Sequence, residues 1–251
     1  MKKSEDFPKA WVFLRGLTRA SFHWLGFQNH FKENFQCEQV YTPELAGNGL
    51  LFEEVSNISI DLAVEQLRSQ IDLKKNQKLG LFTISMGGMI GTRWAEMYPN
   101  EITHLVLTNT SFSSLSPFYH RLLPNNYVGI TENFLFSNPQ RMEEFIMKST
   151  SNLEEKWRPC LEKLVQFQKT YPVSLSNFMR QLKMSGQAEF QAKPLAKTLI
   201  LSSFADKLVS RKCSEAIAHF WNVEIESHPT AGHDLAFDDP DWIFEKISEH
   251  F

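Results

Sequence analysis

The sequence has little of several features that would assign its class at once. It has only three cysteines, Cys37, Cys160 and Cys213, which are odd in number and widely spaced. This pattern fits neither a disulfide framework nor a zinc site, so we expect plain buried thiols. No run of 18 apolar residues is present, and the first ten residues, MKKSEDFPKA, have lysines without an apolar stretch behind them. The sequence therefore predicts no membrane span and no secretory signal, and we expect a cytoplasmic protein.

A strong excess of one charge is also missing. The 251 residues carry a formal net charge of −3, without a basic stripe or a long block of like charges. We therefore expect no nucleic-acid partner. What the chain does have is 42% hydrophobic residues, which is enough for a sizeable core, and 21 phenylalanines. We expect one α/β domain with an insertion, in which most phenylalanines fill the core and some line an apolar pocket.

The stretch from Leu79 to Pro99, LGLFTISMGGMIGTRWAEMYP, combines a strand, a sharp turn and a helix. Its first six residues are almost all apolar, which is typical of a strand buried on both faces in a parallel sheet. Beyond Ser85, apolar residues recur at helical spacing until Pro99 ends the helix. The start of this helix contains three glycines, Gly87, Gly88 and Gly91, although glycine is a poor helix former. We explain them by a close approach of the helix backbone to the strand, which leaves no room for side chains. Ser85 then lies at a helix N-terminus, where backbone N–H groups stabilise an anion.

Residues Thr83 to Gly87 resemble the G-x-S-x-G nucleophile elbow of the α/β-hydrolase superfamily, in which the serine attacks an acyl group. Thr83 replaces the first glycine, so the turn must accommodate one small β-branched side chain. Taken alone, the stretch also fits plain packing of a helix on a strand. The rest of the chain supports the resemblance, which extends from Trp11 to the carboxyl end.

A second loop of interest, Arg15-Gly16-Leu17, follows a short apolar strand at residues 11–14. In α/β-hydrolases the equivalent stretch is usually His-Gly-x, and the backbone N–H of the residue after the glycine is one oxyanion donor. The resemblance therefore implies an oxyanion hole formed by the backbone N–H groups of Leu17 and Met86. Arg15 replaces the usual histidine, but the expected donor is a backbone group and does not depend on that side chain.

Two loops near the carboxyl end supply an acid and a base. The apolar run at 198–204 is followed by ADKLV, which resembles the superfamily's G-x-x-D-x-x-V motif and contains Asp206. The string AGHDL around His233 resembles the loop of the catalytic histidine. The order Ser85, Asp206, His233 matches the superfamily order and implies a catalytic triad. Asp234 is expected instead to tie down its loop by accepting backbone N–H bonds, because adjacent side chains in an extended loop point apart.

The expected fold is an α/β-hydrolase fold with a mostly parallel sheet of about six strands and a helical cap. Only ten residues precede Trp11, so we expect the superfamily's first strands to be missing. Helices are expected at 21–35, 58–73, 213–221 and 241–251, and strands at 11–14, 39–42, 79–84, 102–107, 198–204 and 223–226.

The α/β alternation stops at residue 111 and resumes after residue 191. The segment between is helix-biased, rich in aromatic residues and too long for a simple crossover, so we interpret 111–191 as a cap and 1–110 with 192–251 as the core. A helix is expected to start at Ser137-Asn138-Pro139 and another near Trp157. We expect cap aromatic residues to form an apolar acyl pocket over Ser85, with Phe112, Phe118 and Tyr119 as substrate-binding residues and the others contributing: Phe134, Phe136, Phe145 and Phe178.

These features predict a serine hydrolase that cleaves carboxylic esters through an acyl-enzyme intermediate, without a metal or organic cofactor. Among known members the chain most resembles small esterases that cleave pimeloyl-carrier-protein methyl ester, so the expected partner is a small-molecule or carrier-linked acyl ester. Two alternatives stay open. A thioesterase would use the same three residues, and a non-catalytic ligand-binding protein would keep the hydrolase fold without turnover.

Overall fold

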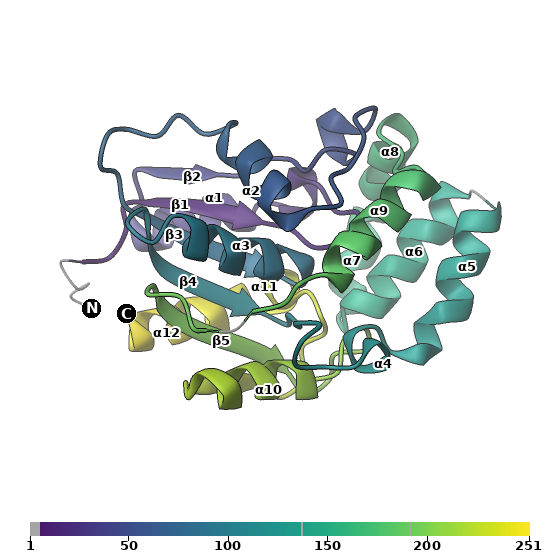
Figure 1. Ribbon diagram of the computed structural model, residues 1–251. Coiled ribbons are helices and arrows are strands. Elements are labelled where there is room, and N and C mark those ends of the chain that lie inside the picture. The colour runs from purple at the N-terminus through teal and green to yellow at the C-terminus, as the bar shows by residue number, and fades with distance from the viewer. Residues whose placement is uncertain (1–5, 137, 191) are drawn as a thin grey trace.

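The computed structural model describes residues 6–136, 138–190 and 192–251, with the backbone alone at 134–136. Its centre is a sheet in the order β2-β1-β3-β4-β5-β6, in which every neighbouring pair is parallel (Figure 1). The predicted sheet of about six strands is confirmed. Within the described residues, β1 is the first strand in chain order. The strands are β1 (Ala10–Leu14), β2 (Gln39–Tyr41), β3 (Leu79–Ile84), β4 (Ile102–Thr108), β5 (Lys197–Ser203) and β6 (Ile225–His228).

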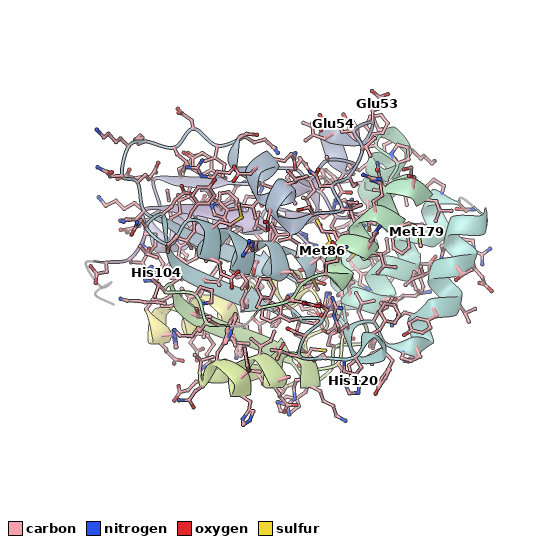
Figure 2. The ribbon with its side chains drawn as sticks, viewed as in Figure 1. Glu53, Glu54, Met86, His104, His120 and Met179 are labelled. Atoms are coloured by element: carbon pink, nitrogen blue, oxygen red, sulfur yellow. The ribbon has the colours of Figure 1, made fainter. Side chains whose placement is uncertain are left out.

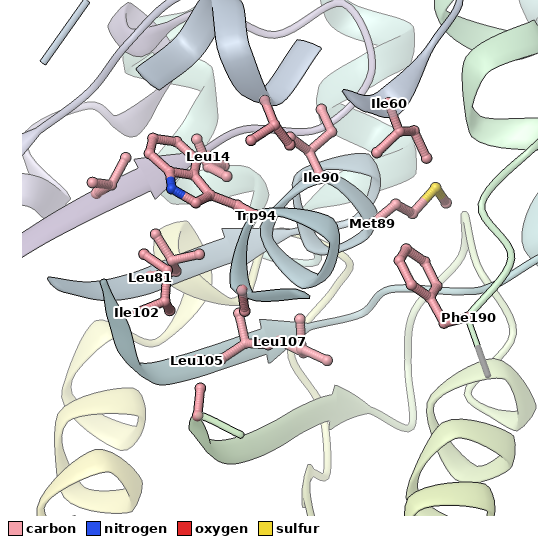
Figure 3. Close-up of a cluster of buried hydrophobic side chains, with 14 of the residues drawn as sticks. Leu14, Ile60, Leu81, Met89, Ile90, Trp94, Ile102, Leu105, Leu107 and Phe190 are labelled. Atoms are coloured by element: carbon pink, nitrogen blue, oxygen red, sulfur yellow. The ribbon is translucent and has the colours of Figure 1, made fainter. Parts of the chain in front are cut away.

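Alternate residues of the central strands belong to two separate hydrophobic clusters, because successive side chains of a strand point to opposite faces. In β1, Val12 and Leu14 pack with one cluster, whereas Trp11 and Phe13 pack with the other. The first cluster is covered by α2 (Ile60–Arg68), α3 (Met86–Met97) and α10 (Lys212–Trp221). Figure 3 shows Ile60 of α2 and Met89, Ile90 and Trp94 of α3 in this cluster. The second is covered by α1 (Phe27–Phe35) and α12 (Pro240–His250). Burial on both faces explains the nearly continuous apolar runs of the strands.

Several element boundaries differ from the sequence prediction. The helix expected at 21–35 is divided into a 3₁₀ turn, η1 (Ser21–Trp24), and α1, because Leu25 and Gly26 between them have φ angles of 48° and 97°. Helix α2 is shorter than expected: Ser59 caps it through a hydrogen bond from the Leu62 N–H, and it ends at Arg68. Strand β6 lies two residues further along the chain than expected.

Most of the described chain between β4 and β5 is helical. Residues 111–191, for which the sequence predicts a cap, are called the cap segment. Figure 1 shows its helices grouped beyond the carboxyl ends of the strands. Helix α6 starts at Pro139, where the Asn138 side chain accepts the Arg141 N–H; Ser137 lies outside the described residues. The cap segment contains α4 (Phe118–Arg121), η3 (Pro124–Asn126), α5 (Tyr127–Phe136), α6 (Pro139–Thr150), α7 (Glu154–Trp157), η4 (Arg158–Cys160), α8 (Leu161–Thr170) and α9 (Leu175–Gly186).

Candidate active site

Ser85 joins β3 to α3 with a backbone conformation that residues with side chains rarely adopt. Its φ is 57° and its ψ is −121°. The strain is held from both sides, because the Ser85 N–H donates to the Thr108 carbonyl oxygen (2.9 Å) and the Thr110 hydroxyl donates to the Ser85 carbonyl oxygen (2.6 Å). Such a turn lifts the serine side chain out of the sheet at the start of a helix, as the nucleophile-elbow resemblance implies.

The glycines after Ser85 allow α3 to pack directly against the strands. A Cβ placed on Gly87 would lie 2.3 Å from the carbonyl oxygen of Leu14, and one placed on Gly91 would lie 2.7 Å from Cγ2 of Thr83. Thr83 also donates its hydroxyl hydrogen to the carbonyl oxygen of Val106 (2.7 Å). The threonine that replaces the first glycine of the motif is therefore accommodated by the missing side chain of Gly91.

His233 and Asp206 follow different strands and meet at the carboxyl edge of the sheet. His233 Nδ1 lies 2.7 Å from Asp206 Oδ2, and the two side chains are only 5% and 2% exposed. The other carboxylate oxygen, Oδ1, accepts the backbone N–H groups of Leu208 (2.7 Å) and Val209 (2.9 Å). These bonds orient the carboxylate towards the imidazole ring.

Asn109 positions the loop that carries His233, a role that reasoning from the sequence missed. Its Nδ2 donates to the His233 carbonyl oxygen (2.8 Å), and its Oδ1 accepts the Ser203 N–H (3.0 Å). Its φ is 47°. Asparagine tolerates this left-handed conformation better than most residues, and an asparagine directly after a buried strand was the only available signal.

The loop that carries Leu17 lies beside Ser85. A Cβ placed on Gly16 would lie 3.1 Å from Ser85 Cβ and 3.6 Å from Ser85 Oγ. Met86 is the buried first residue of α3, and Figure 2 shows it at the end of that helix that faces the cap segment. The structure thus brings both candidate oxyanion residues next to the candidate nucleophile.

A cavity of about 120 Å³ lies where Ser85, His233 and Leu17 face the cap segment. The candidate nucleophile and the candidate base therefore open into a common space. Most of its remaining wall is apolar and comes from the cap segment, through Leu122, Ile130, Met142, Phe145, Ile146, Val173 and Phe178.

The aromatic residues predicted for this pocket are only partly found there. Phe145 and Phe178 line the cavity, whereas the side chains of Phe134 and Phe136 lie outside the described residues. The three residues predicted to bind substrate, Phe112, Phe118 and Tyr119, do not line it.

The reasons for this correction differ. Phe112 is fully buried in the core, with its ring centroid 4.3 Å from that of Phe190 and 5.3 Å from that of Trp221. Phe118 and Tyr119 belong to the short helix α4, which packs beside α10, and they are 51% and 56% exposed.

Two arginines of the cavity wall are each paired with a carboxylate. Arg15 binds Asp234 through two hydrogen bonds, Nη2 to Oδ2 (2.6 Å) and Nη1 to Oδ1 (3.3 Å). Arg19 binds Glu143 of α6 through two hydrogen bonds as well, from Nη1 to the two carboxylate oxygens at 2.9 and 3.0 Å. Asp234 was expected to accept backbone N–H groups, so its pairing with Arg15 corrects that expectation. Both cationic groups are neutralised by partners within the protein.

The described residues contain no cluster of three or more His, Cys, Asp or Glu side chains placed to hold a metal ion. In the same part of the chain, we find no helix whose length and apolar character would let it cross a bilayer.

The comparisons with known proteins agree with this architecture. The family model described as alpha/beta hydrolase fold matches residues 12–240. No curated protein matches the chain. Similar solved structures include MGS-M2, an alpha/beta hydrolase enzyme from a Medee basin deep-sea metagenome library, with a TM-score of 0.69 and 20% identity over 97% of this chain and 89% of that one.

Two further structures show the same likeness. The 2-hydroxy-6-oxo-6-phenylhexa-2,4-dienoate hydrolase from Rhodococcus sp. strain RHA1 has a TM-score of 0.75 and 17% identity over 97% of this chain and 90% of that one. A marine microorganism esterase has a TM-score of 0.66 and 14% identity over 98% and 96% of the two chains. At these identities the structures support the fold alone, whereas the family model covers most of the sequence. The chain belongs to the alpha/beta hydrolase fold family.

Proposed function

We propose that the protein is a serine hydrolase that cleaves carboxylic esters through a triad of Ser85, His233 and Asp206. The observation that carries the proposal is the 2.7 Å contact between His233 Nδ1 and Asp206 Oδ2, beside a cavity that Ser85 and His233 both line. The strained backbone of Ser85 supports the same assignment, because such strain persists only where the surrounding structure enforces it.

In the proposed mechanism, Ser85 Oγ attacks the ester carbonyl carbon while His233 Nε2 accepts the hydroxyl proton. Asp206, bound to Nδ1, holds the imidazole in the required tautomer and stabilises the imidazolium. The backbone N–H groups of Leu17 and Met86 stabilise the oxyanion, an effect of about 10²–10³ in rate per donor. His233 then protonates the leaving alcohol, and water releases the acyl group from Ser85 by the same steps.

The cavity favours a compact, uncharged acyl group. Its volume of about 120 Å³ is comparable to that of an apolar cavity of about 150 Å³ that holds benzene. Arg15 and Arg19, the cations of its described wall, are already paired with carboxylates. We therefore propose esters of short to medium acyl chains as substrates. The cavity accounts for the acyl part alone, and attachment of that acyl group to a carrier protein stays a prediction.

The proposal is tested by labelling with a fluorophosphonate probe. The wild-type protein should be labelled once, and Ser85→Ala should remove the label while the circular dichroism spectrum stays unchanged. Ser149→Ala is the matched control: Ser149 also lines the cavity, but its hydroxyl donates to the Phe145 carbonyl oxygen. Labelling that survives in Ser85→Ala would contradict the assignment of the nucleophile.

Turnover distinguishes the proposed esterase from its alternatives. The wild-type protein should hydrolyse p-nitrophenyl esters with a higher kcat/KM than the corresponding acyl thioesters of equal chain length. A higher kcat/KM for the thioesters would identify a thioesterase with the same triad. Binding of esters without turnover would identify a non-catalytic ligand-binding protein.

A further inference from the structure

We propose that Arg15 and Asp234 are a positioning pair that fixes the oxyanion loop, residues 15–19, against the histidine loop, residues 229–234. This inference rests on the proposed function. Arg15 lies two residues before Leu17, and Asp234 directly follows His233. A contact between these two side chains therefore joins the loop with a proposed oxyanion donor to the loop with the proposed base.

The geometry of the pair is that of a clamp. The two hydrogen bonds, at 2.6 and 3.3 Å, join both terminal nitrogens of Arg15 to both carboxylate oxygens of Asp234. Because the guanidinium and carboxylate groups are planar, two parallel bonds fix orientation as well as distance. The side chains are only 8% and 10% exposed. An ion pair this buried is screened weakly by solvent, unlike a surface pair.

Further contacts hold each half of the pair. The Arg15 guanidinium lies 4.7 Å above the ring of Trp24. On the other side, the backbone N–H of Asp234 donates to the carbonyl oxygen of Thr150 at the end of α6 (2.7 Å). Arg15 is therefore confined by the core and Asp234 by the cap segment. The clamp joins two anchored elements.

The remainder of the oxyanion loop is tied to other parts of the protein. The Thr18 N–H donates to Gln181 Oε1 of α9 (3.0 Å), and Arg19 binds Glu143 of α6. These contacts set the loop against the cap segment. The Arg15 pair instead holds the oxyanion loop against the loop of His233. It therefore sets the distance between the proposed oxyanion donor and the proposed base, on which the reaction depends. A misplacement of about 1 Å in such an arrangement can lower the rate about 10²-fold.

The pair also balances charge beside the proposed base. His233 must become positively charged as it accepts the Ser85 proton, and an uncompensated Arg15 would oppose that charge. Asp234 cancels it. Removing either partner should therefore move the acid limb of the kcat/KM profile, and the two removals should move it in opposite directions.

Other charged groups near His233 stay constant in this comparison. Asp206 binds its ring, Asp238 of α11 (Leu235–Asp238) accepts the Gly232 N–H, and Arg19 is paired with Glu143. Burial raises the pKa of Asp238, and Asp234 raises it further. Asp234→Asn removes the contribution of Asp234 to the Asp238 pKa, which is smaller than that of burial, and changes this pKa in one direction only. This change cannot move the acid limb in opposite directions in the two single variants.

The experiment compares Arg15→Gln, Asp234→Asn and the double variant, with kcat and kcat/KM measured from pH 4.5 to 9 on one p-nitrophenyl ester. We expect each single variant to lower kcat between about 10- and 100-fold. The acid limb should move to lower pH in Asp234→Asn and to higher pH in Arg15→Gln, by roughly half a pH unit each. In the double variant, which is neutral at both positions, the limb should return to the wild-type pH.

Two controls separate positioning from general stability. Arg15→Lys keeps the charge but loses the two-bonded geometry, so kcat should fall without a shift of the acid limb. Arg68→Gln removes another two-bonded pair, which is less buried, and in which Arg68 binds Glu101 through Nε (3.0 Å) and Nη2 (2.8 Å). Glu101 lies just before β4, at the opposite end of the strands from Ser85. Arg68→Gln should leave the kcat and the pH profile unchanged.

Several outcomes would overturn the proposal. Single variants with wild-type kcat, or with shifts in the same direction, would exclude a positioning pair. Loss of the folded circular dichroism spectrum in Arg15→Lys would assign the pair to folding instead. Failure of the proposed function itself is recognised separately, because the wild-type protein would then show no ester hydrolysis that depends on Ser85.

Discussion

Thr83 and Gly91 fit together where β3 packs on α3, because a Cβ on Gly91 would lie 2.7 Å from Cγ2 of Thr83. Both positions are buried, and Thr83 donates its hydroxyl hydrogen to the carbonyl oxygen of Val106. The elbow motif has glycine at the position of Thr83. The larger side chain of Thr83 is therefore matched by the missing side chain of Gly91, which lies one helical turn beyond Gly87. The pairing keeps the helix close to the strand that leads to Ser85.

Gly91→Ala should lower the free energy of unfolding by about 1–3 kcal/mol, because an added methyl group overpacks this contact. Thr83→Ser in the same chain should restore much of the loss, since it removes Cγ2 and keeps the hydroxyl. Urea unfolding of the two single variants and the double variant measures the coupling. Gly186→Ala is the control, because a Cβ there would meet no atom within 4 Å. Strictly additive losses in the double variant would contradict the proposed fit.

Phe145→Ala should enlarge the cavity and move the acyl preference towards longer chains. Phe145 lines the cavity from α6, whereas the exposed Phe118 does not reach it. The measurement is kcat/KM for acetyl, butyryl and octanoyl esters of p-nitrophenol. Phe118→Ala should keep the wild-type preference. Equal kcat/KM values for the three esters in the wild-type protein would contradict an acyl pocket in this place.

Burial of His104 should make the protein less stable in mild acid. The residue is 1% exposed, and its Nε2 has no hydrogen-bond partner among the described residues. Burial lowers its pKa to about 4. Figure 2 shows it at the side of the molecule away from the cap segment. The unfolded chain therefore binds a proton below pH 6.5 that the folded chain binds only near pH 4. Stability falls as the pH falls through this window, by roughly 3 kcal/mol in total.

His104→Phe should reduce this dependence, because phenylalanine cannot be protonated and the site is already lined by aromatic rings such as that of Phe251. Urea unfolding at pH 7 and pH 4.5 gives the difference in the free energy of unfolding. Burial also lowers the pKa of His23, which the variant keeps. The stability of the variant should therefore still depend on pH, but less than that of the wild-type protein. An unchanged difference between the two pH values would show that His104 does not cause it.

The strands and the loops after them could be predicted because each has a local signal. Apolar runs mark β3 and β5, and short motifs follow them at Ser85 and Asp206. In a parallel sheet, loops that follow different strands gather at one edge, so their meeting also follows from the sequence. Within the described residues the structure agrees, since it brings Asp206 to His233.

The cavity wall and the Arg15 pair could not be predicted in this way. Phe145 faces the cavity and Phe118 faces solvent, although both lie in aromatic, helix-biased sequence. Which helix face turns towards Ser85 depends on how the cap helices pack, and no local pattern encodes that choice. Arg15 and Asp234 are 219 residues apart in sequence, and only the fold makes them neighbours.

Asp206, rather than the adjacent Asp234, should be the acid that serves His233. Asp206→Asn should lower kcat by about 10⁴, because an amide in place of the carboxylate favours the wrong imidazole tautomer and leaves the imidazolium without its counter-charge. Asp234→Asn should cost about 10- to 100-fold, since Asp234 acts through Arg15 and does not bind the ring. Saturation kinetics at the pH optimum of each variant, with circular dichroism as the check on folding, provide the comparison. A large loss in Asp234→Asn together with near wild-type kcat in Asp206→Asn would reverse the assignment, although the 2.7 Å contact with Nδ1 favours Asp206.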